Sequence, residues 1–236
     1  MSATVEFFDL QAPLYDAYQR SCVPRYDDMI SCSVSFLSHV LRDKERLTIL
    51  DLGCGTGNTS LRLAESLPLH RLSCLDGSHE MLSLARKKLT SRVVDFHQAD
   101  LEREGWDLNW ENHTFDAAVS VLVLEHLDRP AYLRCLKGLK RILKPGGWLA
   151  TVEAYRGDLN LELYFREMER ATEAAIQGGI VPRDTLEELT RLSKEKERHY
   201  YVSKDEKKKW WVDCGFEEVD FVWQYYCVAL LVGRNG

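Results

Sequence analysis

The residues with the clearest chemical potential form a glycine-rich loop, Asp51-Leu-Gly53-Cys-Gly55-Thr-Gly57, directly after an apolar run. Glycines let the backbone approach a ligand closely, and a helix that begins after the loop adds N–H donors. The loop does not match G-x-G-x-x-G, and no Gly-Lys-Ser/Thr follows it. Because the acid before the first glycine would repel a pyrophosphate and attract an ammonium group, the loop predicts a ligand that carries an amino acid.

Two further acids follow the next predicted strands. Asp76 comes after the run 71–75, and Asp100 comes after the run 93–98. The carboxyl ends of parallel strands meet at one edge of a sheet, which is where open α/β folds bind ligands. There Asp76 could accept bonds from both hydroxyls of a ribose, and Asp100 could accept one from an adenine amine. Each acid alone is better explained as an exposed loop residue, but the ordered set with Asp51 favours a nucleoside site.

The middle of the chain alternates strands with helices. Apolar runs predict strands over 47–52, 71–75, 93–98, 115–121 and 147–153, and apolar spacing predicts helices over 59–67, from Ser78 onward and over 131–143. The alternation predicts an α/β fold with a doubly wound, mostly parallel sheet and helices on both of its faces. We expect Pro145, followed by Gly146 and Gly147, to end a helix and turn the chain.

The two flanks predict a helical cap over one edge of this sheet. Residues 1–42 predict helices before the first strand, and 159–176 and 184–198 predict helices after the fifth. Ser203 and Glu206 form a capping box for one more helix. The runs 216–224 and 225–232 predict two strands that pair antiparallel. Because no linker separates these parts, we expect a single domain.

The motif series ILDLGCGTGN, CLDGS, HQADLE, FDAAVSVLVLEHL and LKPGG resembles that of class I methyltransferases that use S-adenosylmethionine (SAM). The resemblance covers residues 47–153 and implies a seven-stranded, Rossmann-like methyltransferase sheet with SAM as its cofactor. We therefore expect one SAM-binding domain over 1–236, with an N-terminal helical cap (1–42), a SAM-binding core (47–153), inserted cap helices (159–213) and a terminal β-hairpin (216–232). The cofactor-binding residues that the resemblance implies are Asp51, Gly53, Cys54, Gly55 and Gly57 at the methionine part, Asp76 and Gly77 at the ribose, Asp100 and Leu101 at the adenine, Met81 against the ring, and Val121 beside the sulfonium.

The flanks extend the resemblance. The segment Arg20-Ser-Cys-Val-Pro-Arg-Tyr26 and the ending Trp223-Gln-Tyr-Tyr-Cys-Val-Ala-Leu are similar to carboxy-SAM synthase and related small bacterial methyltransferases. This match implies that Tyr26 reaches the cofactor from the helical cap. Carboxy-SAM synthase also uses an arginine in the inserted helices, and Arg191 lies near the corresponding place. The fourth-strand motif of carboxy-SAM synthase has an asparagine at the position where this chain has Val121.

Four residues are candidates for catalysis of an in-line displacement at the sulfonium, which needs the reacting atoms aligned at about 3–3.5 Å in a dry site. Glu153 and Tyr155 follow the fifth predicted strand, and Glu153 could accept a proton or orient a substrate amine. A structural salt bridge is an equal alternative for Glu153. Tyr15 belongs to an aromatic cap segment, where packing in the core is an equal explanation. His126 follows the fourth strand and could act as a general base, although a structural role is the more common one for histidines there.

Three functions are compatible with these residues. The first is methyl transfer from SAM to a small-molecule acceptor. The second consumes SAM without moving its methyl group, either by closing its methionine part on its own amine, which yields azetidine-2-carboxylate and methylthioadenosine, or by building carboxy-SAM. The third is a non-catalytic SAM-binding module, which the retained chemistry of every cofactor position disfavours.

Composition excludes several other classes. The net charge of −6 argues against a nucleic-acid-binding surface. No apolar run approaches the ~20 residues of a membrane helix, and no signal peptide is visible. The seven scattered cysteines favour a reducing cytoplasm. Asp95 and His97 have no third ligand nearby, so no metal is predicted. The expected partner is a small-molecule substrate, and the cap could be self-contained or exchange across a homodimer.

Overall fold

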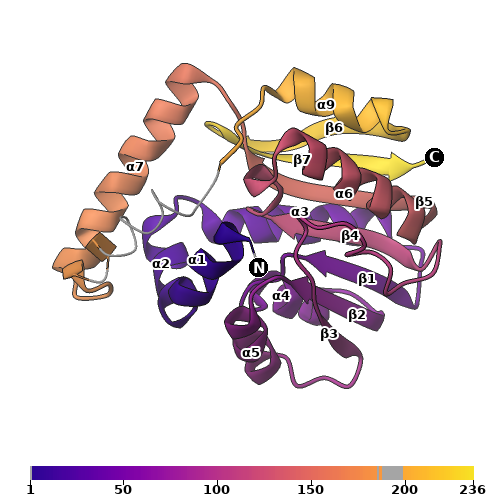
Figure 1. Cartoon of the computed structure of the whole chain (residues 1–236), viewed down its shortest axis with the longest axis horizontal. Coiled ribbons are helices and arrows are strands. Elements are labelled where there is room, and N and C mark those ends of the chain that lie inside the picture. The colour runs from indigo at the N-terminus through magenta and orange to yellow at the C-terminus, as the bar shows by residue number, and fades with distance from the viewer. Residues whose placement is uncertain (1, 185, 188–198) are drawn as a thin grey trace.

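The computed structural model describes residues 2–184, 186–187 and 199–236. Its centre is a seven-stranded sheet in the order β3-β2-β1-β4-β5-β7-β6 (Figure 1). The strands from β3 to β5 run parallel, whereas β7 is antiparallel to both of its neighbours. The strands span Leu47–Leu52 (β1), Leu69–Asp76 (β2), Val94–Gln98 (β3), Phe115–Val121 (β4), Leu143–Ala154 (β5), Phe216–Tyr225 (β6) and Val228–Asn235 (β7). The predicted α/β fold with a seven-stranded, mostly parallel sheet is confirmed.

The helices form two groups: those that cover the sheet and those at its carboxyl edge. Their bounds are Ala3–Gln11 (α1), Ala12–Leu14 (η1), Tyr15–Cys22 (α2), Tyr26–Val40 (α3), Asn58–Ser66 (α4), His79–Lys88 (α5), Leu124–His126 (η2), Arg129–Ile142 (α6), Asp158–Gln177 (α7) and Lys204–Asp213 (α9). Because side chains alternate between the two faces of a strand, β1 contributes side chains to two separate hydrophobic cores. Ile49 packs with Met29 of α3 on one face, and Leu50 packs with Leu136 of α6 and Trp211 of α9 on the other.

The chain order of the strands creates the place for a ligand. The chain runs from the central β1 outward through β2 to β3, and then returns to β4 on the opposite side of β1. The crevice beyond the carboxyl ends of β1 and β4 is therefore the topological switch point, where open α/β sheets bind their ligands. α1 and α2 lie at this edge, and α7 lies farther out beside α2 (Figure 1).

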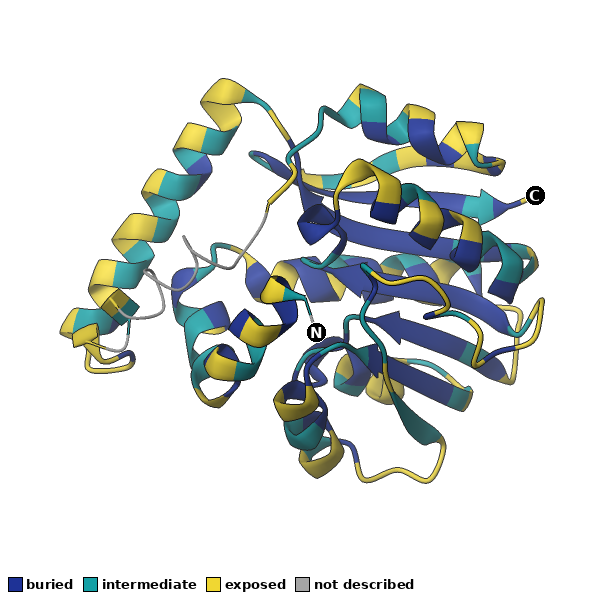
Figure 2. Cartoon of the chain, viewed as in Figure 1, coloured by how far each residue is buried: buried dark blue, intermediate teal, exposed yellow. Residues whose placement is uncertain are grey.

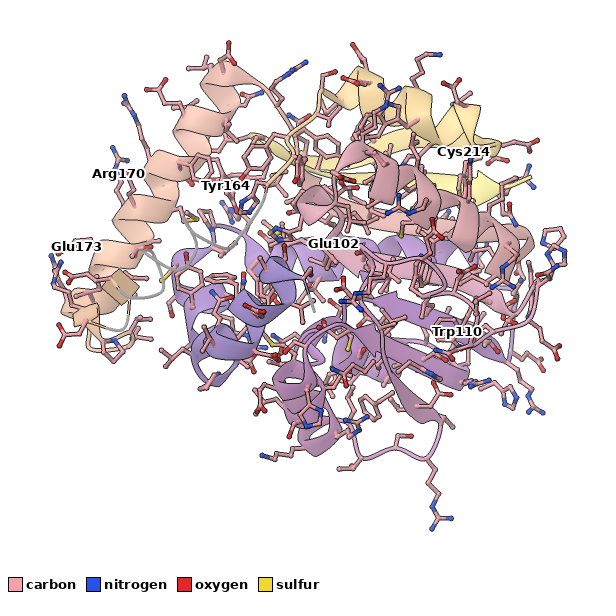
Figure 3. The ribbon with its side chains drawn as sticks, in the orientation of Figure 1. Glu102, Trp110, Tyr164, Arg170, Glu173 and Cys214 are labelled. Atoms are coloured by element: carbon pink, nitrogen blue, oxygen red, sulfur yellow. The ribbon has the colours of Figure 1, made fainter. Side chains whose placement is uncertain are left out.

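The long helix α7 is the most exposed element of the described chain. Its side chains are mostly half-buried or exposed, whereas the central strands β1, β4, β5 and β7 are mostly buried (Figure 2). Tyr164 and Ala175 are its buried residues. Figure 3 shows Tyr164 on the side of α7 toward the sheet and Arg170 on the opposite side. α7 is thus held through one narrow stripe of contacts.

Local sequence signals placed most elements correctly. The predicted strands 47–52 and 115–121 coincide with β1 and β4. Two predicted helix caps are confirmed, because Ser78 Oγ accepts from Met81 N at 3.0 Å and Ser203 Oγ accepts from Glu206 N at 3.3 Å. The antiparallel pairing of the last two strands is also confirmed.

One turn prediction was wrong. Helix α6 ends at Ile142, before the Pro145-Gly146-Gly147 segment, and the segment lies inside β5. The left-handed φ of 74° at Gly146 lets this strand shift its register against β4 without leaving the sheet. The helix predicted over 184–198 falls largely outside the described residues, as does Arg191. Within the described residues, no helix is both long and apolar enough to cross a membrane.

Candidate cofactor and acceptor site

The glycine loop joins β1 to α4 at the switch point. Gly53, Gly55 and Gly57 all have a left-handed φ, at 73°, 53° and 84°. A side chain at Gly53 would also collide, because its Cβ would lie 2.5 Å from methyl carbons of Val123. These constraints explain why glycines occupy the turn. Gly53 and Gly55 line the cavity described below, so a ligand there would lie against the backbone of the loop, and the N-terminus of α4 follows directly.

Asp76, at the end of β2, holds the loop and faces the same space. Its Oδ2 accepts from Gly55 N and its Oδ1 accepts from Ser78 N, each at 2.8 Å. An ionised carboxylate has about four lone-pair sites, so both oxygens can still accept from a ligand. Burial raises the pKa of Asp76 to about 6, although these two backbone bonds oppose the shift. A pair of hydroxyls would complete its hydrogen bonding and favour the ionised form.

Asp51 supports the loop from beneath. Its side chain is buried at the end of β1, and its Oδ2 accepts from Ser60 Oγ of α4 at 2.5 Å. Burial raises the pKa of Asp51 to about 7, with Asp76 adding to the shift and Ser60 opposing it. A nearby ammonium group would reverse this shift, because an opposite charge favours the ionised carboxylate.

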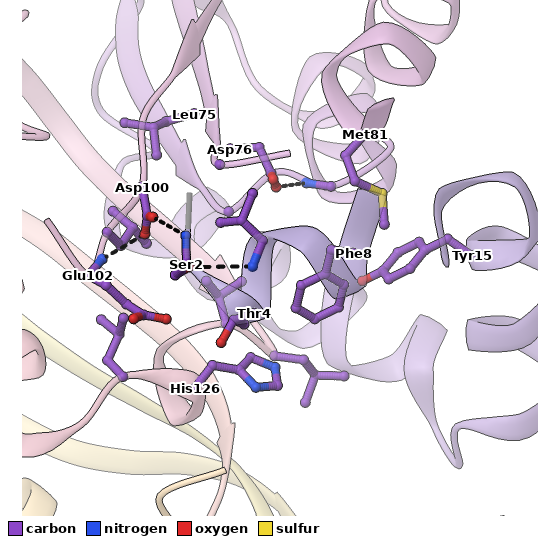
Figure 4. Close-up of a pocket in the computed structure, with 18 residues that line it drawn as sticks. Ser2, Thr4, Phe8, Tyr15, Leu75, Asp76, Met81, Asp100, Glu102 and His126 are labelled. Carbon is purple, nitrogen blue, oxygen red and sulfur yellow. Dashed lines mark hydrogen bonds between the residues drawn. The ribbon is translucent and has the colours of Figure 1, made fainter. Parts of the chain in front are cut away.

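The glycine loop opens into a cavity that we call the loop cavity (Figure 4). It is lined by Ser2, Thr4, Val5, Phe8, Tyr15, Gly53, Gly55, Leu75, Asp76, Gly77, Met81, Asp100, Leu101, Glu102, Leu122, Val123, His126 and Leu127. The cofactor positions predicted at the ribose and adenine all line it. It combines a carboxylate on each side with apolar walls from Met81 and Leu101. These residues fit a SAM molecule. Its adenosine has ribose hydroxyls and an amine that donate hydrogen bonds to carboxylates, and an apolar ring that packs between such walls.

Helix α1, which belongs to the helical cap predicted over 1–42, forms the roof of the loop cavity. Ser2 N donates to Asp100 Oδ2 at 3.0 Å (Figure 4). Val5 packs directly over Gly77, where a Cβ would lie 2.6 Å from its methyl carbon. Phe8 meets His126 edge to face, with ring centroids 5.3 Å apart. A run of two phenylalanines in a short helix was the available signal, but spacing alone does not show what a helix covers.

Helix α2 closes the other side of the loop. The ring of Tyr15 lies 3.6 Å from the position of a Cβ on Gly55. Burial raises the pKa of Tyr15 well above its usual value, so it is a neutral phenol. Tyr26 accepts from Asn58 Nδ2 at 3.2 Å and lines neither the loop cavity nor the cavity described next. Tyr15, a catalytic candidate from the sequence, thus borders the loop cavity, whereas Tyr26, which the resemblance placed at the cofactor, lies behind the loop.

A second cavity of about 380 Å³, which we call the aromatic cavity, lies between the cap and the sheet. It is lined by Phe7, Phe8, Gln11, Tyr15, Tyr18, Gln19, Val23, Leu122, Glu125, His126, Ala154, Tyr164, Phe165, Met168, Leu186, His199, Tyr201 and Val228. Among the described residues, four line both cavities: Phe8, Tyr15, Leu122 and His126. The two spaces are thus separated by these shared side chains.

The four catalytic candidates divide into two pairs. Tyr15 and His126 lie at the shared wall. Glu153 and Tyr155 line neither cavity, and here the structure corrects the sequence interpretation. Strand alternation turns Glu153 toward α6 and α9, where its oxygens accept from Tyr132 at 2.8 Å and from Lys207 Nζ at 2.7 Å. Glu153 is therefore a buried salt-bridge partner, which was the alternative explanation for it.

Four predicted cofactor residues act on the loop indirectly. Asp51, Cys54, Gly57 and Val121 do not line the loop cavity. At this strand end Leu122 and Val123 line the loop cavity in place of Val121. Leu122 has a left-handed φ of 56°, which is rare for a residue with a branched side chain, and its N donates to Val152 O at 2.8 Å. This strain places Leu122 in the wall between the two cavities, and no sequence signal indicated it.

A parallel sheet in this order, with a glycine loop and acids at successive strand ends, defines the class of Rossmann-like nucleoside-binding enzymes. A family model described as "Methyltransferase domain" matches residues 49–147. Residues 49–147 therefore form a methyltransferase domain of the class I SAM-dependent kind, whose cofactor is SAM, as the resemblance predicted.

Curated relatives match the core of the chain. It is 33% identical over 141 residues to a demethylmenaquinone methyltransferase of Listeria monocytogenes serotype 4a (strain HCC23), which covers 55% of this chain and 57% of the relative. It is 32% identical over 159 residues to the enzyme of that name from Lactococcus lactis subsp. lactis (strain IL1403), covering 60% and 61%. The chain thus spans less than two thirds of the length of these relatives.

Solved structures share the fold over nearly the whole chain. One is a complex of DhpI with S-adenosylhomocysteine (SAH), with a TM-score of 0.65, 18% identity and coverage of 99% of this chain and 96% of that one. Another is magnesium protoporphyrin IX methyltransferase from Synechocystis PCC 6803 with bound SAH, with a TM-score of 0.62, 19% identity and coverage of 92% and 87%. At this identity the likeness extends to the fold alone.

Proposed function

We propose that the protein transfers a methyl group from SAM to a small-molecule acceptor. SAM would occupy the loop cavity, and the acceptor would occupy the aromatic cavity. The observation that carries this proposal is the wall of Phe8, Tyr15, Leu122 and His126, which borders both spaces. A donor and an acceptor held on its two sides would meet there, and positioning supplies much of the rate of such a displacement.

The residues of the loop cavity would bind and orient the cofactor, which supplies an activated methyl group on sulfur. Asp76 would accept from the ribose hydroxyls, and Asp100 would accept from the adenine amine while Leu101 and Met81 cover the ring. The proposed roles of Asp51, Cys54 and Gly57 are to hold the loop in shape from behind. Each assignment follows from the chemistry of a residue and its place at the loop.

The residues of the shared wall would exclude water and handle the proton of the acceptor. His126 lies at the junction and can accept a proton from an attacking group, so we propose it as the general base. Tyr15 is a neutral phenol that can donate a hydrogen bond, and the faces of Phe8 and Tyr15 attract the cationic sulfonium. A dry wall of this kind suits a transition state in which charge is dispersed.

The names of similar proteins support a small organic acceptor. The curated relatives are named for demethylmenaquinone, and one structural neighbour is named for magnesium protoporphyrin IX. A cavity of about 380 Å³ has room for a ring system of a few fused rings. A small-molecule acceptor, a cytoplasmic location, the absence of a nucleic-acid partner and a cap that could exchange across a homodimer stay predictions.

One experiment separates methyl transfer from the reactions that consume SAM alone. The purified protein is incubated with SAM, with and without a mixture of small aromatic and aliphatic acceptors, and the products are identified by mass spectrometry. We expect SAH only when an acceptor is present. Methylthioadenosine formed from SAM alone, above the background of a matched Asp76→Ala variant, would instead establish intramolecular cyclisation. Binding of SAH with neither product would identify a non-catalytic module.

A further inference from the structure

Two glutamines that line the aromatic cavity have side-chain carbonyl oxygens that are buried without a partner among the described residues. Gln11 ends α1 and Gln19 lies in α2, and their residues are only 5% and 7% exposed. Within the described part of the chain, neither Oε1 atom accepts a hydrogen bond. Both residues line the aromatic cavity. Buried polar atoms are nearly always hydrogen-bonded, so unsatisfied amide oxygens on two residues that line the same cavity point to a missing donor.

Aromatic rings form much of the surroundings of these amides, together with the polar side chains of Glu125, His126 and His199. Phe8, Tyr18, Tyr164 and Phe165 contribute rings to the walls of the same cavity. Ligand pockets typically combine such walls with a few polar groups that fix the orientation of the ligand. Rings select a planar ligand because they stack offset or meet edge to face. The two amide oxygens select hydrogen-bond donors on that ligand.

We propose that the acceptor is a planar aromatic compound that carries hydroxyl groups, and that Gln11 and Gln19 accept hydrogen bonds from them. This inference rests on the proposed function, because it assigns the acceptor side of the same site. An aromatic hydroxyl donates strongly to an amide oxygen, and it also accepts from the amide NH2, so it suits both ends of a glutamine. Gln11 and Gln19 are thus specificity-determining residues rather than catalytic ones.

The test compares two probes of nearly the same shape, 2-naphthol and 2-methylnaphthalene, by fluorescence titration with the protein in the presence and absence of SAH. An apolar cavity alone would favour 2-methylnaphthalene, because it buries one more apolar group. We expect the wild-type protein to bind 2-naphthol about tenfold more tightly, since a satisfied amide is worth about that ratio.

Two leucine variants and one control assign this preference to the glutamines. Gln11→Leu and Gln19→Leu keep the size of the side chain but remove its hydrogen bonds, so each is expected to reduce the preference to about threefold or less. Gln177→Leu removes an exposed glutamine of α7 that bonds to Glu173, and it should keep the full preference. Thermal unfolding checks that the variants fold. Comparing the binding of the two probes to the wild-type protein tests the inference even if a variant does not fold.

The outcomes separate this inference from the proposed function. Equal binding of the two probes to the wild-type protein, or a preference that survives both leucine variants, would show that water satisfies the amides and would overturn the inference. Failure of SAH to bind would contradict the proposed function, whereas the titrations without SAH would still decide the role of the glutamines.

Discussion

Lys88 Nζ, at the end of α5, lies 2.8 Å from Asp16 Oδ2 in α2. The same ammonium group donates to Asn58 Oδ1 at 2.6 Å and to Thr56 Oγ1 at 3.2 Å. Asp16 Oδ1 in turn accepts from Thr56 and Asn58. One lysine therefore joins the N-terminal cap to both ends of the turn that leads from the glycine loop into α4. Through this network the position of Tyr15 is coupled to the shape of the loop.

Replacing Lys88 with methionine should loosen this junction. Asp16 is 41% exposed in its side chain, so solvent screens the ion pair and the expected loss of stability is only about 1 kcal/mol or less. The affinity for SAH should fall more clearly, by about threefold to tenfold, because α2 would no longer be held over the loop. Isothermal titration calorimetry measures this change. Lys87→Met is the matched control, since Lys87 makes none of these three bonds, and an equal loss in both variants would contradict the coupling.

Replacing Asp76 with alanine should weaken SAM by one to three orders of magnitude. A carboxylate that accepts from two ribose hydroxyls makes two charge-assisted bonds, each worth about 1.5–3 kcal/mol, and about 1.4 kcal/mol corresponds to a factor of ten. Calorimetry on the folded variant provides the measurement, with Asp220→Ala on the exposed strand β6 as its control. Unchanged affinity in Asp76→Ala would remove Asp76 from the cofactor site.

The affinity for SAH should fall as the pH is lowered from 8 to 5. The pKa of Asp51 is raised to about 7 and that of Asp76 to about 6, and ligand binding favours the ionised form of both. Below these values a proton must leave for each group that ionises, so affinity should drop by up to about tenfold per pH unit and per group. Asp76→Asn should remove the additional dependence that begins below about pH 6 and leave the contribution of Asp51. A flat profile in the wild-type protein would refute the assignment.

The same raised pKa values act in the opposite direction on the stability of the ligand-free protein. A carboxyl group with a folded-state pKa above its ordinary value binds its proton more tightly in the folded state. Asp51 and Asp76 therefore contribute a stability that increases as the pH falls through about 7 toward 4. Urea denaturation of the wild-type protein and of Asp51→Asn over this range should reveal the difference in slope. Parallel slopes would contradict it.

Breaking the ion pair between Glu153 and Lys207 should lower the stability of the protein without changing its affinity for the cofactor. Both side chains are almost completely buried, at 1% and 2% exposure. Removal of one partner leaves an uncompensated buried charge, which typically costs about 3–5 kcal/mol. Lys207→Met should therefore lower the midpoint of urea unfolding strongly, and the double variant Glu153→Gln/Lys207→Met should recover part of the loss. Neither variant should change the affinity for SAH in its folded form, whereas a selective loss of activity would restore Glu153 to the site.

Sequence alone was sufficient for the features that depend on local backbone and periodicity. The glycines at 53, 55 and 57 indicate a turn with left-handed backbone. The apolar runs identify the strands even when their neighbours in the sheet are unknown. Asp76 and Asp100 could be placed because parallel strands bring their carboxyl ends to one edge, whatever the details of packing. The family and its cofactor could be predicted for the same reason, since the motifs that carry them are short and local.

Which side chains face a cavity depends instead on packing between distant segments. Neighbouring side chains along a strand point to opposite faces of the sheet. The side chain of Glu153 therefore points toward Lys207, with which it forms a salt bridge, and away from the site. Gln11, Gln19 and Phe8 belong to cap helices that no local pattern orients relative to the sheet, because their contacts are with segments far away in the chain. The strand-end residues of the proposed cofactor site are thus encoded in local sequence, whereas its roof and the proposed acceptor site arise from how the cap packs on the sheet.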